Sequence, residues 1–115
     1  MHEFSIVQSL IELVEEQARK HGASKVLKLE LVVGDLSGVE PHLLKLAFDT
    51  FKEDTVADGA ELLIHRERLR LYCGDCGRES EKEELNLLCP KCGSLNTQVI
   101  AGQELLLKSV EMEKE

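Results

Sequence analysis

CGDCGRESEKEELNLLCPKCG, residues 73–93, is the stretch that sets the organisation of this 115-residue chain. It holds two CxxC pairs, Cys73 with Cys76 and Cys89 with Cys92, with twelve residues between the pairs and a glycine after each. A CxxC turn presents two sulfur atoms on one side of an ion, and two such turns complete the tetrahedron that zinc prefers. The glycine relaxes the turn, because it tolerates a positive φ. We therefore predict a structural zinc site with four cysteine ligands and no open position.

Other interpretations of the four cysteines are two disulfides, a rubredoxin-type iron site and a thioredoxin-like redox pair. A redox pair would open a helix after a strand, and the residues around these pairs do not show that pattern. The first Lys or Arg is Arg19, unlike a secretory signal, and no apolar run approaches the roughly 20 residues that span a bilayer. We expect a cytoplasmic location without membrane attachment, where cysteines are more often metal ligands than disulfides.

Outside this module the residue pattern predicts two helices and three strands. They are a helix over residues 4–20, a strand over 26–33, a helix from Pro41 to near 58–59, and strands over 61–72 and 104–112. Two helices can cover one face of a three-stranded sheet. We predict an α+β fold: a small two-layer α/β domain, residues 1–71 and 102–115, with a zinc-ribbon module, residues 72–101, inserted into it.

Alternating apolar residues predict which face of each strand is buried. In the first strand Leu27, Leu29, Leu31 and Val33 are expected on one face. In the last strand Leu105 and Leu107 are expected on one face, and Leu106, Val110 and Met112 on the other face.

The charge of the chain argues against a nucleic-acid partner. The formal net charge is −8, from 22 acidic and 14 basic residues, and such a surface repels phosphate backbones. Aromatic residues are only 3% of the chain, so surfaces on which bases could stack are scarce as well. We expect protein and metal-ion partners instead.

The ends of the chain carry the most specific pattern. Met1-His2-Glu3 with Ser5, the helix start at Glu40-Pro41, the paired CxxC turns and the closing Glu104–Glu111 segment resemble the HypA/HybF hydrogenase nickel-incorporation proteins. The resemblance extends over essentially the whole length. It implies a metallochaperone that binds nickel at its N-terminus and zinc in the ribbon, and that works with the GTPase HypB. The implied target is the large subunit of [NiFe]-hydrogenase, and some members also serve urease maturation.

The resemblance implies nickel binding at the N-terminus, and the chemistry of that segment makes His2 and the Met1 amine the expected ligands. Nickel(II) accepts nitrogen-rich coordination, and these groups, with the backbone amides between them, form one short chelate. Glu3 is expected to be a ligand or a nearby compensating charge. Glu40 matches the acidic residue that some family members use before the second helix, and it serves equally well as a helix N-terminal carboxylate. The other three histidines, His21, His42 and His65, are explained as helix-end, surface and strand-face residues.

Two other classes of function compete with this interpretation. A zinc-ribbon adaptor or nucleic-acid module is the first, although residues 72–100 hold more acidic than basic residues and offer no basic face. A zinc enzyme is the second, and it would need an open ligand position and a general base nearby. Four cysteine ligands leave no such position, so we do not expect an enzyme.

Overall fold

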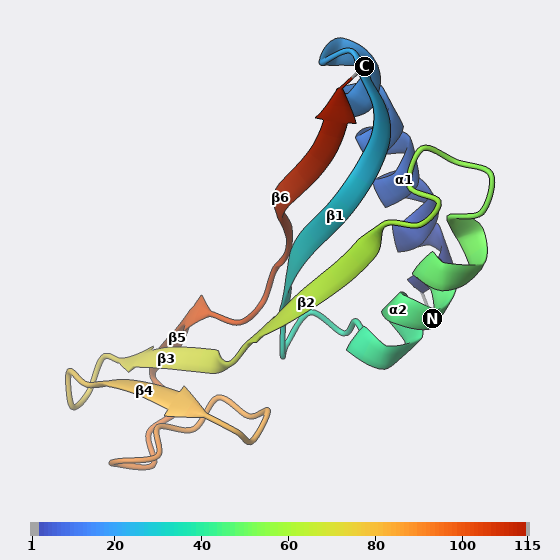
Figure 1. Ribbon diagram of the computed structural model, residues 1–115. Helices are drawn as coiled ribbons and strands as arrows, with labels where there is room; N and C mark the ends of the chain where they lie inside the picture. Colours follow the sequence, from blue (N-terminus) through green and yellow to red (C-terminus); the bar gives the residue numbers. More distant parts are fainter. Residues whose placement is uncertain (1–2, 115) are drawn as a thin grey trace.

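The structure is a computed structural model that describes residues 3–114, and Figure 1 shows it as a ribbon. The elements are α1 (Glu3–Lys20), β1 (Ala23–Gly34), α2 (Pro41–Phe51), β2 (Glu61–Glu67), β3 (Leu69–Cys73), β4 (Glu79–Lys82), β5 (Thr97–Ala101) and β6 (Leu105–Lys114). They form an elongated molecule of 56 × 26 × 16 Å. The predicted α+β class is confirmed, with two helices and two three-stranded sheets among the described residues.

Helix α1 follows from the helical spacing of its apolar residues. The buried ones are Val7, Leu10, Ile11, Val14 and Ala18. Arg19 and Lys20 occupy the last turn, where cations interact favourably with the helix dipole. Gly22 has a φ of +66°, which ends the helix without steric cost and lets β1 begin. Neither helix in the described part of the chain is long and apolar enough to cross a membrane.

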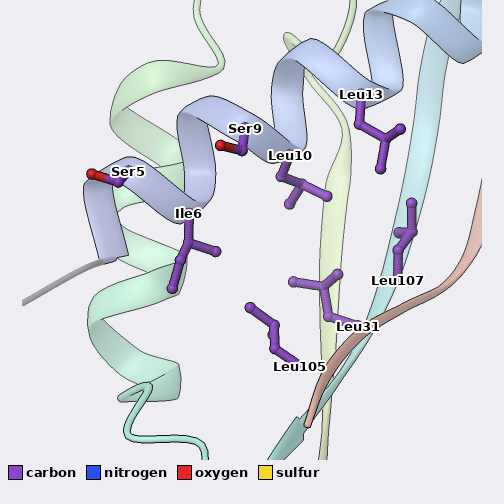
Figure 2. Close-up of a pocket in the computed structure, with 8 residues that line it drawn as sticks. All are labelled: Ser5, Ile6, Ser9, Leu10, Leu13, Leu31, Leu105 and Leu107. Carbon is purple, nitrogen blue, oxygen red and sulfur yellow. The ribbon is translucent and has the colours of Figure 1, made fainter.

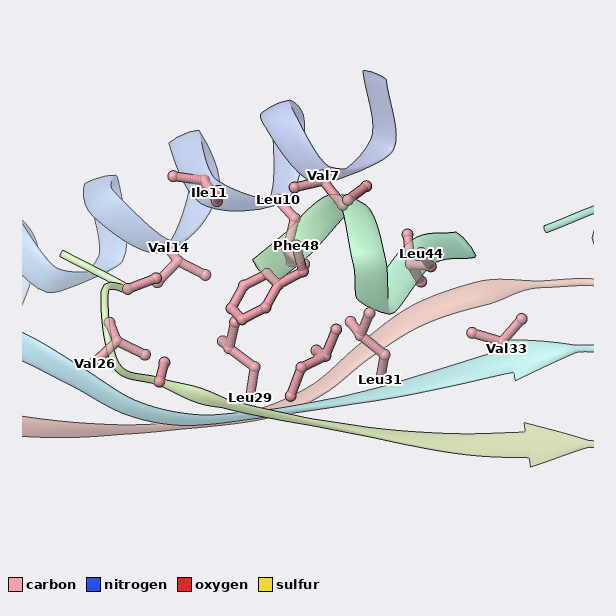
Figure 3. Close-up of a cluster of buried hydrophobic side chains, with 14 residues drawn as sticks. Val7, Leu10, Ile11, Val14, Val26, Leu29, Leu31, Val33, Leu44 and Phe48 are labelled. Carbon is pink, nitrogen blue, oxygen red and sulfur yellow. The ribbon is translucent and has the colours of Figure 1, made fainter. Parts of the chain in front are cut away.

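The first sheet has the strand order β2-β1-β6. Strands β1 and β2 are parallel and are connected through α2, whereas β6 is antiparallel to β1 on its other side. Both helices lie on one face of this sheet, α1 against β1 and α2 against β2 (Figure 1). The core between the layers contains Phe48, Leu29 and Leu44, which are fully buried (Figure 3). The predicted two-layer arrangement is therefore confirmed.

The second helix is shorter than predicted. It ends at Phe51 rather than near residues 58–59, and Lys52 donates its backbone N–H to the Phe48 carbonyl as the last helical bond. Asp54 then adopts a φ of +63°, which stops helical propagation. The Thr55 hydroxyl and N–H both donate to the Lys52 carbonyl, so a turn forms where the helix would have continued.

The predicted strand over residues 61–72 is in fact two strands in different sheets. Strand β2 ends at Glu67, Arg68 separates them, and β3 begins at Leu69. Strand β3 is central in the second sheet, whose order is β4-β3-β5 with antiparallel neighbours. Sequence reasoning identified neither β4 nor β5. The division of the chain at residues 71/72 and 101/102 stays a prediction.

The expected faces of β1 and β6 were partly wrong, because both strands carry irregularities. Leu31 pairs with Leu107 and Glu30 pairs with Ser109, so Lys108 is an extra residue in β6. A bulge of this kind reverses the alternation. Leu105, Leu107, Val110 and Met112 therefore all pack against the core, while Leu106 is exposed. A second shift, between Val26 and Lys28, buries Val26 in place of Leu27.

The two sheets meet at a tight glycine junction, where the end of β1 touches the segment before β6. The Gly34 N–H donates to the Glu104 carbonyl at 2.8 Å, and the Leu36 N–H donates to the Gly102 carbonyl at 2.7 Å. The Gly102 N–H donates to the Glu67 carboxylate at 3.1 Å. Gly102 has a φ of +97°, a conformation that L residues rarely adopt. The junction thus joins β1, β2 and the cysteine module at one point.

Candidate metal centres

The four cysteines converge as the sequence predicted. The Sγ atoms of Cys73 and Cys92 are 3.6 Å apart, those of Cys76 and Cys89 are 3.7 Å apart, and all four lie within 4.8 Å of one another. A tetrahedral ion with metal–sulfur bonds of about 2.3 Å requires sulfur–sulfur separations of about 3.8 Å. A disulfide would need about 2.05 Å, and none of the cysteines is in one. The geometry fits a tetrahedral tetrathiolate metal site.

Two equivalent turns build this site. In the first, the Cys73 N–H donates to the Arg78 carbonyl at 2.9 Å, and the Gly77 N–H donates to the Cys73 carbonyl at 2.9 Å. The second repeats these bonds at Cys89 and Gly93. The glycines have φ values of +72° and +76°, as expected for the residue that follows each CxxC. The repetition explains why two short local motifs suffice to bring four sulfur atoms together.

Within this close cluster of four sulfur atoms, the pKa values of two thiols are shifted in opposite directions. The backbone N–H of Cys92, followed by that of Lys91, lowers the pKa of the Cys89 thiol to about 6. The Ser94 N–H acts in the same direction on Cys92, but neighbouring Cys73 and loss of hydration outweigh it and raise the pKa of Cys92 to about 12. Four thiolates this close repel one another, and a divalent cation at their centre offsets that repulsion.

Polar residues that sequence reasoning missed support the module. Asp75 accepts hydrogen bonds from the Ser94 hydroxyl and from the Asn96 amide at 3.1 Å, and so connects the two cysteine turns. These two bonds, with Ser94 the larger contributor, lower the pKa of Asp75. Lys82 is buried, and its ammonium group donates to the Leu88 carbonyl at 2.6 Å. In the sequence, the one signal for these supporting residues is the position of Asp75 inside a CxxC pair.

The predicted nickel ligands lie at the other end of the molecule, and the structure describes only part of them. Met1 and His2 are outside the described residues. Glu3 is only 5% exposed, and its Oε2 atom accepts the backbone N–H of Glu40 at 3.1 Å. Glu40 itself forms the N-cap of α2, and its Oε1 atom accepts the His42 N–H at 3.2 Å. Glu3 and Glu40 are therefore neighbours, at the adjoining N-terminal ends of the two helices.

Of the remaining histidines, His42 follows Glu40 in the first turn of α2, whereas His21 and His65 lie away from Glu3 and Glu40. His21 bonds to the Gln17 carbonyl at 2.8 Å at the end of α1. On the sheet face away from the helices, the Nε2 atom of His65 lies 3.0 Å from Glu30. In the described part of the chain, the cysteine cluster is the one group of three or more His, Cys, Asp or Glu residues close enough to share an ion.

Comparison with known proteins agrees with this arrangement. A protein-family model described as "Hydrogenase/urease nickel incorporation, metallochaperone, hypA" matches residues 1–112. The chain belongs to the HypA family. Membership places it among the nickel metallochaperones of hydrogenase maturation and confirms the resemblance seen in the sequence.

Relatives in the HypA family match over nearly their whole length. The hydrogenase maturation factor HypA of Aquifex aeolicus is 63% identical over 113 residues, 98% of each chain. HypA of Shewanella oneidensis is 45% identical over 114 residues, 99% of this chain and 97% of its own. The solution structure of the Ni metallochaperone HypA from Helicobacter pylori is 37% identical with a TM-score of 0.69, and all of both chains is covered. A second HypA solution structure is 38% identical with a TM-score of 0.74, covering 100% of this chain and 98% of its own.

Proposed function

We propose that this protein binds nickel(II) through His2 and a free Met1 amine and delivers it during [NiFe]-hydrogenase maturation. The family match carries the proposal, because it extends over residues 1–112 and so includes the Met1-His2-Glu3 segment. The fixed position of Glu3 supports it. Its carboxylate is bound to the start of α2, so it holds the start of α1 and keeps a negative charge beside the proposed ligands.

The start of α1 suits a metal that must later be released. The first N–H groups of a helix have no partner within that helix, so they can turn toward a metal without breaking helical bonds. The positive end of the helix dipole disfavours a cation there, and the carboxylates of Glu3 and Glu40 offset this effect. A nitrogen-rich chelate opposed by the dipole is selective for nickel without being very tight. Such a balance serves delivery better than storage.

The tetrathiolate site is proposed to bind zinc in a structural role. Zinc prefers tetrahedral sulfur coordination, and the observed sulfur separations match that preference. Four protein ligands leave no position for substrate, so this site supplies stability rather than catalysis. We propose residues 1–71 and 102–115 as the nickel-binding domain and residues 72–101 as the zinc-ribbon domain. The proposed partners are a HypB-type GTPase, the large subunit of [NiFe]-hydrogenase and urease maturation proteins, in the cytoplasm.

Nickel titration of three forms of the full chain tests the proposal. The native protein should bind one equivalent of nickel. A form with one Gly ahead of Met1 should bind more weakly, because the amine is displaced and the Met1 nitrogen becomes an amide. His2→Gln should also bind more weakly, while zinc content stays unchanged. Binding to the native form should weaken as the pH falls, because protons compete for the amine and the imidazole, whose usual pKa values are about 7.7–8.0 and 6.5.

His65→Gln is the matched control, because that histidine lies on the open face of the sheet and should leave nickel affinity unchanged. Equal affinity of the native and Gly-extended forms would remove the amine from the site. Full nickel binding by His2→Gln would contradict the proposal as a whole.

A further inference from the structure

The helix layer of the first sheet does not extend over its third strand. Helix α2 lies against β2 and α1 lies against β1. Strand β6 directs Leu105, Leu107, Val110 and Met112 to the same face, where they are only partly buried. In the described part of the chain, the inner face of β6 therefore has no helix of its own above it.

An apolar groove of about 390 Å³ lies at this place, between α1 and β6 (Figure 2). One wall is a stripe along α1 made by Ser5, Ser9 and Leu13, which are spaced four residues apart. Leu105 and Leu107 of β6 form the floor. Leu13 is 42% exposed, although its neighbour in the groove, Leu10, is in the core. The groove is thus continuous with the core and open to solvent.

The shape of the groove suits a helix. The stripe from Ser5 to Leu13 is about 12 Å long, a little over two helical turns. Its serines are small, which allows the axis of a second helix to approach α1 closely. A strand added beside β6 is disfavoured, because Lys108 forms a bulge in the middle of that edge, and a bulge with a lysine is a common protection against strand pairing.

Charge indicates what kind of helix fits. Glu12 and Glu16 are exposed and lie on the solvent side of the stripe, three residues after Ser9 and Leu13 respectively. Glu16 is paired with Lys20 at 3.5 Å, which leaves Glu12 as the carboxylate available to an incoming cation. The chain as a whole has a net charge of −8. A second copy would bring the same acidic flank and the same negative charge, so it fits poorly.

We infer that this groove is the docking site for an amphipathic helix of a partner protein, which would complete the helix layer over β6. That helix places apolar side chains at i, i+3 or i+4, and i+7 against Leu13, Leu105 and Leu107, and carries Lys or Arg on the flank that faces Glu12. The groove shares no residue with the four-cysteine cluster, and the inference does not depend on nickel binding.

A synthetic peptide can test this on the full-length, zinc-loaded protein. The probe is a fluorescent peptide about four helical turns long, with leucines at the stated spacing and lysines at the remaining positions. It should bind and shift the backbone amide signals of Ser5–Leu13 and Leu105–Leu107 in NMR spectra. Leu13→Glu should weaken binding at least about tenfold. The matched control is Leu43→Glu, because Leu43 is 46% exposed on α2, away from this groove. This variant should bind the peptide as the native protein does.

Charge and fold are controlled separately. A peptide with glutamates in place of the lysines should bind more weakly to the native protein and gain affinity for Glu12→Lys. Ser9→Gln narrows the groove without adding charge, and it should also weaken peptide binding. It replaces Leu13→Glu as the test if that variant proves poorly folded. Nickel affinity and zinc content should be unchanged in all these variants.

Three results would overturn the inference. They are absence of peptide binding, equal binding by Leu13→Glu and the native protein, and amide shifts centred on α2 or the cysteine module. Sedimentation of the native protein examines the other occupant: a dimer that Leu13→Glu dissociates would assign the groove to a second copy and refute the partner helix.

Discussion

Replacement of Gly102 by alanine should destabilise the protein more than replacement of any glycine that only needs a positive φ. A Cβ atom on Gly102 would lie 2.7 Å from the Arg68 carbonyl oxygen and 2.8 Å from the Leu69 Cα atom. Both are backbone atoms at the point where the chain leaves one sheet for the other. Gly59 is the matched control, because its φ is +85° and its Cβ would meet nothing within 4 Å.

The difference between the two variants isolates the close approach. A positive φ costs alanine about 1–2 kcal/mol, and this cost applies to both variants. Forcing a methyl group into packed backbone adds about 1–3 kcal/mol at Gly102 alone. We expect Gly59→Ala to lower the free energy of unfolding by about 1–2 kcal/mol and Gly102→Ala by about 2–5 kcal/mol. Gly34→Ala tests the steric cost by itself, since its Cβ would overlap the Gly102 carbonyl and its φ is not positive.

Urea unfolding of the zinc-loaded proteins, followed by circular dichroism, measures these free energies. Amide hydrogen exchange locates the effect. Gly102→Ala should reduce protection in both sheets, whereas Gly59→Ala should reduce it only in the first. The prediction is refuted if Gly102→Ala is as stable as Gly59→Ala and Gly34→Ala is as stable as the native protein, because the close approach of the backbones would then cost nothing.

Three further predictions concern the metal site and two polar groups. Removal of zinc, or Cys73→Ser, should abolish amide protection over residues 72–100 and leave the first sheet protected, because the metal supplies much of the folding energy of the module; protected module amides without metal would contradict this. The Ser109 hydroxyl, followed by His65, lowers the pKa of Glu30 to about 2 from 4.5, so its ionised form stabilises the fold above pH 4.5. This contribution is lost as the pH falls toward 2, and unfolding curves of native protein and Glu30→Gln should converge over that interval. Lys82→Met removes the hydrogen bond to the Leu88 carbonyl and should destabilise the module by about 1–3 kcal/mol. Zinc should then pass to a chelator faster than from the native protein. Lys91→Met, at an exposed position, should leave the rate of zinc loss unchanged.

Features that depend on nearby residues could be predicted from the sequence. The two cysteine turns are local, so their spacing alone predicted that the four sulfur atoms converge. Helix α1 was predicted because its apolar period, its basic last turn and Gly22 agree. The proximity of Glu3 and Glu40 was only implied by the family resemblance, because 37 residues separate them in the chain.

Features that depend on tertiary contacts could not be predicted in the same way. No Gly or Pro interrupts residues 61–72, so they were predicted to be one strand, whereas the break lies where Gly102 approaches the backbone of Arg68 and Leu69. The bulge at Lys108 reverses the faces of β6, and it exists only relative to β1. A single-strand pattern contains no information about an extra residue in its partner.

The placement of the cysteine module between β2 and β6 affects the order of events during translation. The nascent chain presents α1, β1, α2 and β2 first, while the β1 edge that β6 will occupy stays open. At about 5–20 residues per second, the segment from Glu67 to Leu105 takes roughly 2–8 s to synthesise. If the thiols bind a metal as proposed, they can capture it over this interval, before the first sheet is complete. An unpaired strand edge invites aggregation, so rapid metal capture, by drawing the module together, would shorten a vulnerable stage in the biogenesis of the protein.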